Sequence, residues 1–345
     1  MRAPEDVVLT PAQWLPPNVV KAVDAQAAGL VTPDEASAMG YERLPVSAAD
    51  AAPELAVRAG RSALARAGVE AAAVRTVLHA WTYYQGHDFW SPAHYVAREV
   101  GAVRAVPIGI QQMCNGGAAG LDAALARLVA EPDHGPVLVT TGDRFAAPGF
   151  DRWGSDYGVW YGDSGTAAVL ARGGAGSEHA LVLRAQVTEA APDLEVVHRD
   201  LDHFQEVPHA AYPTVNVRRT KKAFLTGTGR EPFVARLRET TSRVVAAALE
   251  SARLAPKDPA LRAVLLPRLG GATARDIYGP AVAEITPAPA VDLGADTGHL
   301  GAGDLLSNLT ALGGPGPWAL RPGEHAVVLS AGAGFTWSGV VVGRP

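Results

Sequence analysis

The chain of 345 residues contains one cysteine, Cys114. A single cysteine excludes an internal disulfide framework and any zinc site with several cysteine ligands. It is typical of a reducing compartment, and the first residues show no charged segment followed by an apolar one, so we expect a cytoplasmic protein. The histidines outside the motifs described below show no metal-ligand spacing. We therefore predict no metal site and interpret these histidines as surface or packing residues.

The sequence also lacks long apolar runs and a strong charge of one sign. No run approaches the roughly 18 residues that a membrane helix needs, so we expect no membrane span. The net charge is −5, and without a basic stripe we expect no binding to nucleic acid. The one basic run, RRTKK at 218–222, is interpreted as a solvated loop or helix end. The alternative is a contact for an acidic carrier protein or a phosphate-bearing cofactor.

Apolar residues make up 48% of the chain, which is enough for a large core. Short β-rich runs alternate with alanine-rich helical runs, a pattern typical of an α/β fold. In the first half we predict helices over 50–67 and 116–130 and strands over 74–80, 105–110, 136–141 and 162–171. In the second half we predict strands over 180–187, 263–266, 325–330 and 338–342, helices over 231–254 and 272–278, and a glycine-rich turn and helix over 298–312.

The similar order of elements in the two halves predicts a duplicated βαβ-type fold, although no residue-level repeat is visible. We place the halves at 1–175 and 176–345, with a small, polar seam at 173–179. The segment over 205–217 has no clear period and contains two prolines. Such a segment is interpreted as a loop that lies over a site.

Cys114 lies between the predicted strand over 105–110 and the predicted helix over 116–130. A helix N-terminus offers free N–H groups and a partial positive charge, and both stabilise a thiolate. The glycines and alanines that follow leave room for a substrate to approach the sulfur, and strand–nucleophile–helix is the order of a nucleophile elbow. The context therefore indicates a reactive thiol, and the alternative is a buried, inert cysteine.

Four segments in the same order resemble motifs of the type III ketosynthases. They are the nucleophile segment 114–128, the turn GDSGTAAV at 162–169, the glycine-rich helix start within 298–312, and the turn AGAGFTWSG at 331–339. The resemblance covers essentially the whole chain. It implies the thiolase fold with α-β-α-β-α layers, a homodimer, and an acyl group carried on Cys114 as a thioester. It also implies acyl-CoA or an acyl carrier protein as the acyl donor, with no permanently bound cofactor.

Two positions depart from the condensing members of that family, which use a histidine and an asparagine to decarboxylate a malonyl group. The histidine position is Arg268 in PRLGG at 267–271, and the asparagine position is His299 in GHLGAGD at 298–304. We therefore expect no ordinary carbon–carbon condensation. Cys114, His299 and Asp304 are instead predicted to act as nucleophile, base and orienting carboxylate, with an oxyanion held by the backbone N–H groups of Cys114 and Ala333.

This pattern is similar to an offshoot of the family, found in antibiotic pathways, whose members move acyl groups. Alternatives remain for each residue. His299 could bond a backbone carbonyl, and Asp304 could cap the following helix. Arg268 is either a structural cation or a substrate-binding group that holds the free carboxylate of a malonyl group. Trp90 either reaches across a dimer into the substrate pocket or packs in the core.

Coenzyme A recognition also differs, because Ala36 occupies the position of a tryptophan that stacks on adenine in the family's typical members. The donor is therefore expected to bind differently or to be a carrier protein. The main hypothesis is an acyltransferase that moves an acyl group, of malonyl type, to a hydroxyl of a polyketide or glycoside acceptor without decarboxylation. The alternatives are an acyl shuttle between CoA and carrier proteins, a decarboxylative type III ketosynthase, and a non-catalytic partner subunit.

Overall fold

The computed structural model describes residues 1–173, 177–208 and 210–345. Within them, ten strands form one mixed sheet in the order β10-β9-β11-β12-β8-β1-β7-β6-β4-β5, and β2 and β3 form a separate pair. The strands are β1 (Val7–Trp14), β2 (Val19–Lys21), β3 (Arg43–Pro45), β4 (Thr76–Ala80), β5 (Val106–Ile110), β6 (Val137–Asp143), β7 (Ser164–Arg172), β8 (Leu181–Ala190), β9 (Leu261–Leu265), β10 (Ala290–Val291), β11 (His325–Gly332) and β12 (Thr336–Gly343).

Helices connect and cover these strands. The α-helices are α1 (Ala22–Ala27), α2 (Pro33–Met39), α3 (Ala52–Ala67), α4 (Pro92–Val100), α5 (Gly116–Ala130), α6 (Val196–Arg199), α7 (Val217–Gly227), α8 (Arg230–Ala252), α9 (Gly271–Thr273), α10 (Gly279–Ala283) and α11 (Asp304–Gly313). Short 3-10 or π turns are η1 (Ala71–Ala73), η2 (Met113–Asn115), η3 (Pro192–Glu195), η4 (Ala274–Tyr278) and η5 (Gly301–Gly303).

The strand order reads as two equivalent halves. In the first half β4 pairs in parallel with β5 and β6, while β7 pairs antiparallel with β6 and β1. The second half repeats this arrangement, with β9 parallel to β10 and β11 and with β12 antiparallel to β11 and β8. The halves join where β1 pairs with β8. The predicted duplicated α/β fold is confirmed, whereas the boundary at 175/176 lies outside the described residues and stays a prediction.

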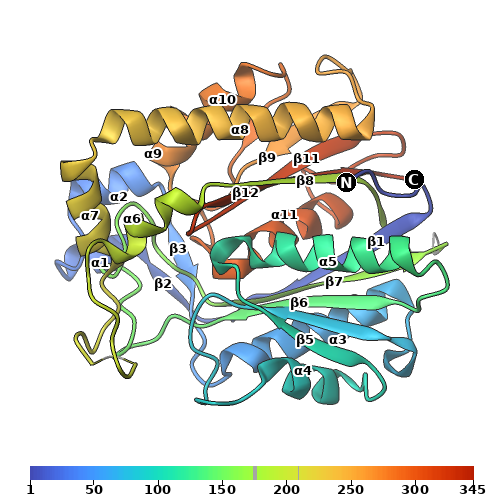
Figure 1. The fold of residues 1–345 in the computed structure, drawn as a ribbon, viewed down its shortest axis with the longest axis horizontal. Helices are drawn as coiled ribbons and strands as arrows, with labels where there is room; N and C mark the ends of the chain where they lie inside the picture. The colour runs from blue at the N-terminus through green and yellow to red at the C-terminus, as the bar shows by residue number, and fades with distance from the viewer. Residues whose placement is uncertain (174–176, 209) are drawn as a thin grey trace.

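The layers of the predicted α-β-α-β-α architecture are visible in Figure 1. Helices α3 and α4 cover the outer face of the first half of the sheet, and α8 and α10 cover the outer face of the second half. Helices α5 and α11 lie between the two halves. Because α5 is enclosed in this way, its predicted apolar face of Leu121, Leu125 and Leu128 is fully buried, and much of the rest is glycine and alanine.

Strand β1 is an element that the sequence pattern did not predict. It contains Pro11, and proline is normally excluded from a central strand because it lacks an N–H to donate. The strand nevertheless pairs with β7 along its whole length and touches β8 on its other side. The apolar face of β1, which includes Val7 and Leu9, belongs to the main core, so burial outweighs the local preference.

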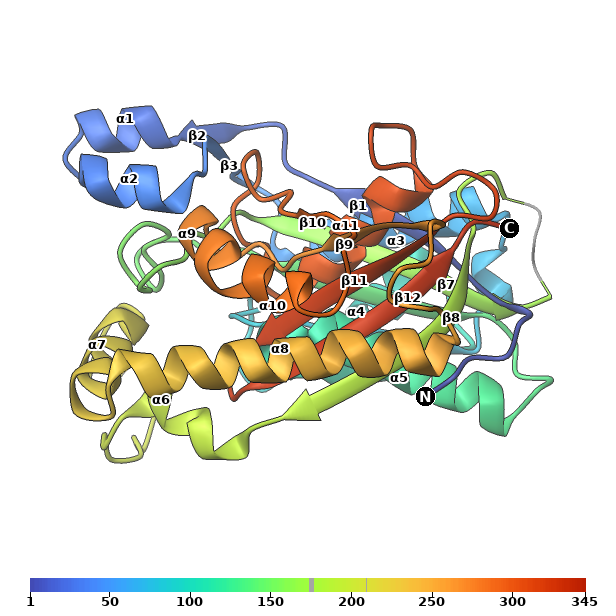
Figure 2. The same cartoon turned by 90° about the horizontal axis from the view of Figure 1, so that it is seen from above.

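The two ends of the molecule differ in character. Helices α1, α2 and α7 and the strands β2 and β3 gather at one end, and the two chain termini lie at the other end (Figures 1 and 2). Within the described residues, no helix is long and apolar enough to cross a membrane.

Candidate active site

Cys114 lies in the short turn η2, between the end of β5 and the start of α5. Its neighbour Met113 has a φ of 49°, a left-handed conformation that costs energy in a residue other than glycine and that recurs at functional sites. Cys114 is 8% exposed. The predicted order of strand, nucleophile and helix is therefore present, with the thiol at the N-terminal end of α5.

Small residues allow other segments to approach this thiol closely. A Cβ on Gly332 would lie 2.5 Å from the backbone nitrogen of Asn115 and 3.2 Å from that of Cys114. A Cβ on Gly117 would lie 2.7 Å from the carbonyl oxygen of Ala302. The glycine-rich turns predicted from the sequence thus bring the end of β11 and the turn η5 against the backbone of the nucleophile.

His299 and Asp304 form a buried pair beside the nucleophile. Nδ1 of His299 lies 2.6 Å from Oδ2 of Asp304. The other carboxylate contacts are backbone N–H groups, which donate from Leu300 to Oδ1 at 2.8 Å and from Arg268 to Oδ2 at 2.9 Å. None of these partners belongs to the first turn of α11, so Asp304 orients the imidazole rather than capping the helix.

The electrostatic surroundings favour the protonated form of His299. Burial alone would lower the pKa of His299, but the carboxylate of Asp304 and the sulfur of Cys114 outweigh burial and raise this pKa well above its usual value. Nε2 of His299 has no hydrogen-bond partner among the described residues. This nitrogen is therefore free to exchange a proton with a reacting group.

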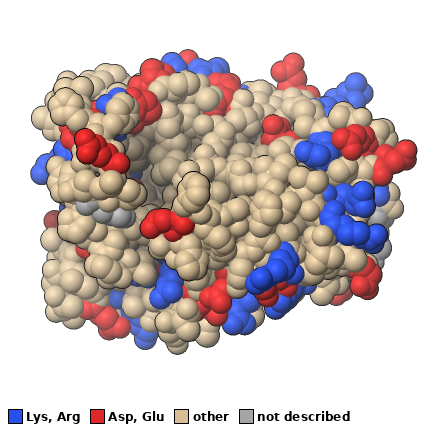
Figure 3. All heavy atoms as spheres, turned by 60° about the horizontal axis from the view of Figure 1, so that its bottom comes forward, with Lys and Arg blue, Asp and Glu red and all other residues tan. Residues whose placement is uncertain are grey.

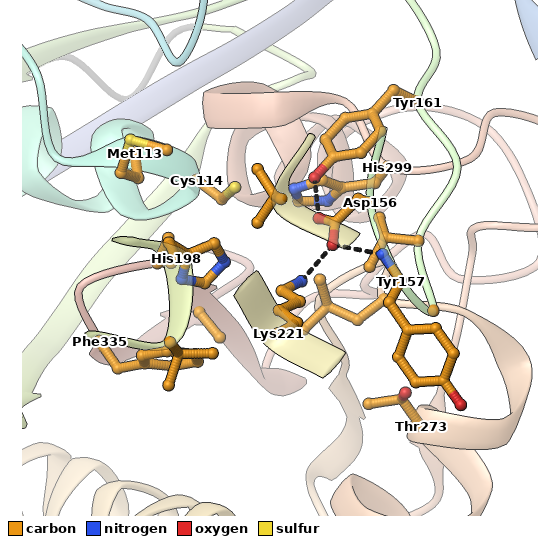
Figure 4. Close-up of a pocket in the computed structure, with 18 of the residues that line it drawn as sticks. Met113, Cys114, Asp156, Tyr157, Tyr161, His198, Lys221, Thr273, His299 and Phe335 are labelled. Atoms are coloured by element: carbon orange, nitrogen blue, oxygen red, sulfur yellow. Dashed lines mark hydrogen bonds and ion pairs between the residues drawn. The ribbon is translucent and has the colours of Figure 1, made fainter. Parts of the chain in front are cut away.

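The thiol and the imidazole line one cavity of about 360 Å³. Figure 4 shows the Cys114 sulfur and the His299 ring facing the same space from different elements. Much of the remaining lining is apolar or aromatic, including Tyr83, Phe145, Phe150, Phe233 and Phe335. Val215 and Val217 also line the cavity, so the segment predicted to lie over a site does reach it. A mostly apolar cavity with a few converging polar groups is the usual form of a small-molecule site.

Solved structures with this fold match nearly the whole chain. ChlB3, described as an acyltransferase, is 26% identical over 98% of both chains with a TM-score of 0.87. The 3-oxoacyl-(acyl carrier protein) synthase III FabH of Pseudomonas aeruginosa PAO1 is 23% identical, covering 100% of this chain and 99% of its own, with a TM-score of 0.75. The tetronic acid condensing enzyme AbyA1 is 22% identical over 98% of this chain and 99% of its own, with a TM-score of 0.72.

The chain shares the fold of these synthase III enzymes, and its similarity to ChlB3 is consistent with a transferase. Neither a protein-family model nor a curated protein matches its sequence. No group of three histidine, cysteine or acidic side chains that could hold a metal ion occurs in the described part of the chain.

The remaining predicted site residues take different places. Ala333 lines the cavity, in the turn after Gly332. Arg268 does not line the cavity: its guanidinium donates to Oδ1 of Asn308 at 3.0 and 3.1 Å and to Oγ1 of Thr297 at 2.6 Å. The Arg268 side chain therefore supports the loop behind the His299–Asp304 pair and is not placed to meet a substrate carboxylate.

Trp90 also lies away from the cavity of its own chain. It is 38% exposed and contacts the rings of His87 and Tyr95. The neighbouring Phe89 is fully exposed. These aromatic residues are available to a partner surface, which leaves the cross-dimer role of Trp90 as a prediction.

A second polar cluster lines the cavity. The sequence motifs did not predict it. The carboxylate of Asp156 accepts the Tyr161 hydroxyl at 2.5 Å and lies 2.6 Å from Nζ of Lys221. His198 lines the same cavity. No local motif joins these residues, because they come from three segments. Only the basic run at 218–222 gave a signal, and its Lys221 points inward from α7.

A buried carboxylate outside the cavity fixes the turn that presents His299. Asp143, at the end of β6, accepts N–H groups from Thr82 and Tyr83 on one oxygen and from Ala302 on the other. Burial raises the pKa of Asp143 to about 6 even though these donors lower it. The contacts tie η5 to the first half of the sheet, and so place the His299 loop against α5.

Proposed function

We propose that this enzyme loads an acyl group from a CoA or carrier-protein thioester onto Cys114 and transfers it to a hydroxyl of a polyketide or glycoside acceptor as an ester. The observation that carries the proposal is the buried His299–Asp304 pair, which faces the nucleophile where condensing relatives have a decarboxylating residue. The arrangement resembles that of the malonyl-ester-forming ketosynthase homologue of cervimycin biosynthesis. ChlB3, also described as an acyltransferase, supports it.

In the first step the Cys114 thiolate attacks the carbonyl carbon of the donor thioester. The raised pKa of His299 means that its imidazole starts the cycle protonated. When the tetrahedral intermediate collapses, the donor carbon–sulfur bond breaks and the leaving thiolate takes the proton from Nε2. The products are acyl-Cys114, the free donor thiol and a neutral His299.

In the second step the acceptor hydroxyl attacks the acyl-Cys114 carbonyl. Acylation has removed the charge on sulfur, so one of the influences that raise the pKa of His299 is lost and the imidazole becomes a base. Nε2 takes the hydroxyl proton, the carbon–sulfur bond breaks, and the ester leaves. The imidazolium and thiolate that started the cycle are restored, so the protons balance over the two steps.

The oxyanion of both intermediates is assigned to the backbone N–H groups of Cys114 and Ala333. Both residues line the cavity, and the absence of a side chain on Gly332 lets the two segments approach each other. Donors fixed by the backbone stabilise developing charge without reorganising.

A homodimer completes the proposal. Strand β5 forms one edge of the sheet, and its Val106 is 57% exposed. An open edge with exposed apolar residues is a template for pairing with another chain. Val103, three residues before Val106, is exposed, and so is Phe89. Figure 3, which turns this lower side of the molecule forward, shows a broad central area with few charged side chains. A second copy of the chain is the proposed occupant, and we place the enzyme in the cytoplasm, where a catalytic thiol stays reduced.

The test is product analysis after incubating the enzyme with malonyl-CoA or a malonyl carrier protein and a panel of hydroxylated acceptors, such as methyl glycosides and glycosylated polyketides. The proposal predicts an ester whose mass includes the whole malonyl group. Release of carbon dioxide with a new β-keto product would show decarboxylative condensation instead. Transfer to carrier-protein thiols alone, with no ester, would identify an acyl shuttle.

A further inference from the structure

We propose that Lys221 and His198 hold the free carboxylate of a malonyl-type acyl group while that group is carried on Cys114. This inference rests on the proposed acyl transfer and names the substrate class that the cavity selects. The sequence suggested Arg268 as the residue that binds this carboxylate. We assign the role to Lys221 because the Arg268 guanidinium forms its hydrogen bonds outside the cavity.

Lys221 presents the ammonium group of a partly buried side chain to the cavity. Its side chain is 17% exposed, and Nζ lies 2.6 Å from Oδ1 of Asp156. An ammonium group has three N–H donors, so two remain after this ion pair. The Asp156 carboxylate already has other partners, because it also accepts the Tyr157 backbone N–H and the Tyr161 hydroxyl. Asp156 therefore fixes the direction of Lys221 and leaves two of its donors for a ligand.

His198 offers a second contact next to Lys221. Nδ1 of His198 is buried and has no hydrogen-bond partner among the described residues. Burial, and then the charge of Lys221, lower the pKa of His198 to about 3, so the ring is neutral and can donate one N–H. Cys114, His198 and Lys221 all line this cavity, and Figure 4 shows their side chains around the same space. The proposal places the carboxylate of a group attached to the Cys114 sulfur against the other two side chains.

The charges that line the cavity favour an anion. Lys221 in the interior and Arg230 at the exposed rim are cationic, and Asp156, which is paired with Lys221, is the carboxylate of the lining. Arg230 makes no ion pair with any residue that the structure describes. The lining therefore carries an excess of positive charge that the carboxylate of an acyl group balances.

The same contact explains how carbon dioxide loss is avoided. Decarboxylation moves the negative charge from the carboxylate to the α-carbon. A cation bound to the carboxylate stabilises the ground state more than the transition state, and so it raises the barrier to decarboxylation. A condensing enzyme needs groups that stabilise the enolate. In this proposal the cation contacts the carboxylate end of the acyl group. At the two positions of the family's decarboxylating pair, this chain has His299, which is paired with Asp304, and Arg268, whose guanidinium is bonded outside the cavity.

The experiment compares how fast Cys114 is acylated by four CoA thioesters in wild type and Lys221→Met, followed by intact-protein mass spectrometry. The thioesters are malonyl, acetoacetyl, butyryl and acetyl. Acetoacetyl has the shape of malonyl without its charge. We expect Lys221→Met to lose malonyl loading by roughly 10- to 100-fold, the cost of a charged hydrogen-bond partner, with acetyl and butyryl loading unchanged. His198→Leu should show the same selectivity to a smaller degree.

Lys222→Met is the matched control, because this neighbour on α7 is exposed and does not line the cavity. Unchanged acetyl loading in Lys221→Met shows that the variant is folded. Equal losses for all four thioesters, or no wild-type preference for malonyl over acetoacetyl, would overturn the inference while leaving acyl transfer intact. Failure of wild type to load any of the four on Cys114 would instead overturn the proposed function.

Discussion

Three residues carry the proposed chemistry, and each needs the others to be in place. Cys114 supplies the nucleophile, His299 moves the proton, and Asp304 fixes the imidazole through one ring nitrogen so that the other faces the thiol. Cys114, His299 and Asp304 could be predicted from the sequence because they lie in glycine-rich motifs with family-like spacing. Lys221 and His198 could not, because only the fold brings their segments to the cavity.

His299→Ala separates the two steps. Without the imidazole, the acyl-Cys114 carbonyl lacks a base to activate the acceptor hydroxyl, and removing a general base costs about 10²- to 10⁴-fold in rate. We expect the variant to accumulate the acyl-enzyme and to discharge it slowly in single-turnover experiments. A variant that discharges its acyl group at the wild-type rate would exclude His299 as the base.

Asp304→Asn changes the pH dependence of the second step in a defined direction. Transfer needs neutral His299, so its rate rises as pH passes upward through the pKa of this histidine in the acyl-enzyme. The carboxylate of Asp304 raises that pKa, and removing its charge lowers it. The acidic limb of the pH–rate profile should therefore shift to lower pH, and the plateau should fall because the ring is less well oriented. An unshifted limb would show that Asp304 does not act on His299.

At the scale of elements, the site depends on close packing of turns against the start of α5. The turn after β11, the turn η5 and the turn η2 approach one another because glycines occupy the contacts. The helices α3, α5, α8 and α11 and most central strands were predicted from alternation and apolar faces, whereas α1, α2, α4 and α7 were not. Strand β1 was not, because Pro11 argues locally against a strand that the core nevertheless stabilises.

Gly332→Ala tests this packing. Its Cβ would lie 2.5 Å from the Asn115 nitrogen, too close for any real contact, so the nucleophile turn must move. We expect at least a tenfold loss in the rate of Cys114 acylation, because small displacements of reacting groups are costly. Gly227→Ala, at the end of α7 with open space around its Cβ, is the control and should retain wild-type acylation. Equal rates in both variants would contradict the assigned contact.

At the scale of the whole molecule, duplication leaves two sheet edges of unequal length. The edge strand β10 has two residues, whereas β5 has five and exposes Val106. The duplicated architecture followed from the order of elements, but dimerisation rests on a resemblance and on this open edge. A lysine introduced on this edge strand should disfavour pairing with a second chain, because burying its charge in the interface is costly.

Val106→Lys is therefore expected to shift the protein from dimer to monomer in sedimentation velocity. Val23→Lys, a substitution at another exposed valine, on α1, should leave the dimer intact. A wild-type protein that sediments as a monomer at micromolar concentration would contradict the proposed assembly, as would a Val106→Lys variant that stays dimeric.

The central claim is that an acyl group passes through Cys114 and leaves to oxygen with its carboxylate intact. Its most direct test is intact-protein mass spectrometry of the enzyme mixed with malonyl-CoA or a malonyl carrier protein, before and after addition of the hydroxylated acceptors. The account predicts an adduct with the mass of the whole malonyl group that is absent in Cys114→Ala and is discharged by an acceptor. An adduct that has lost carbon dioxide, or one that persists in Cys114→Ala, would contradict it.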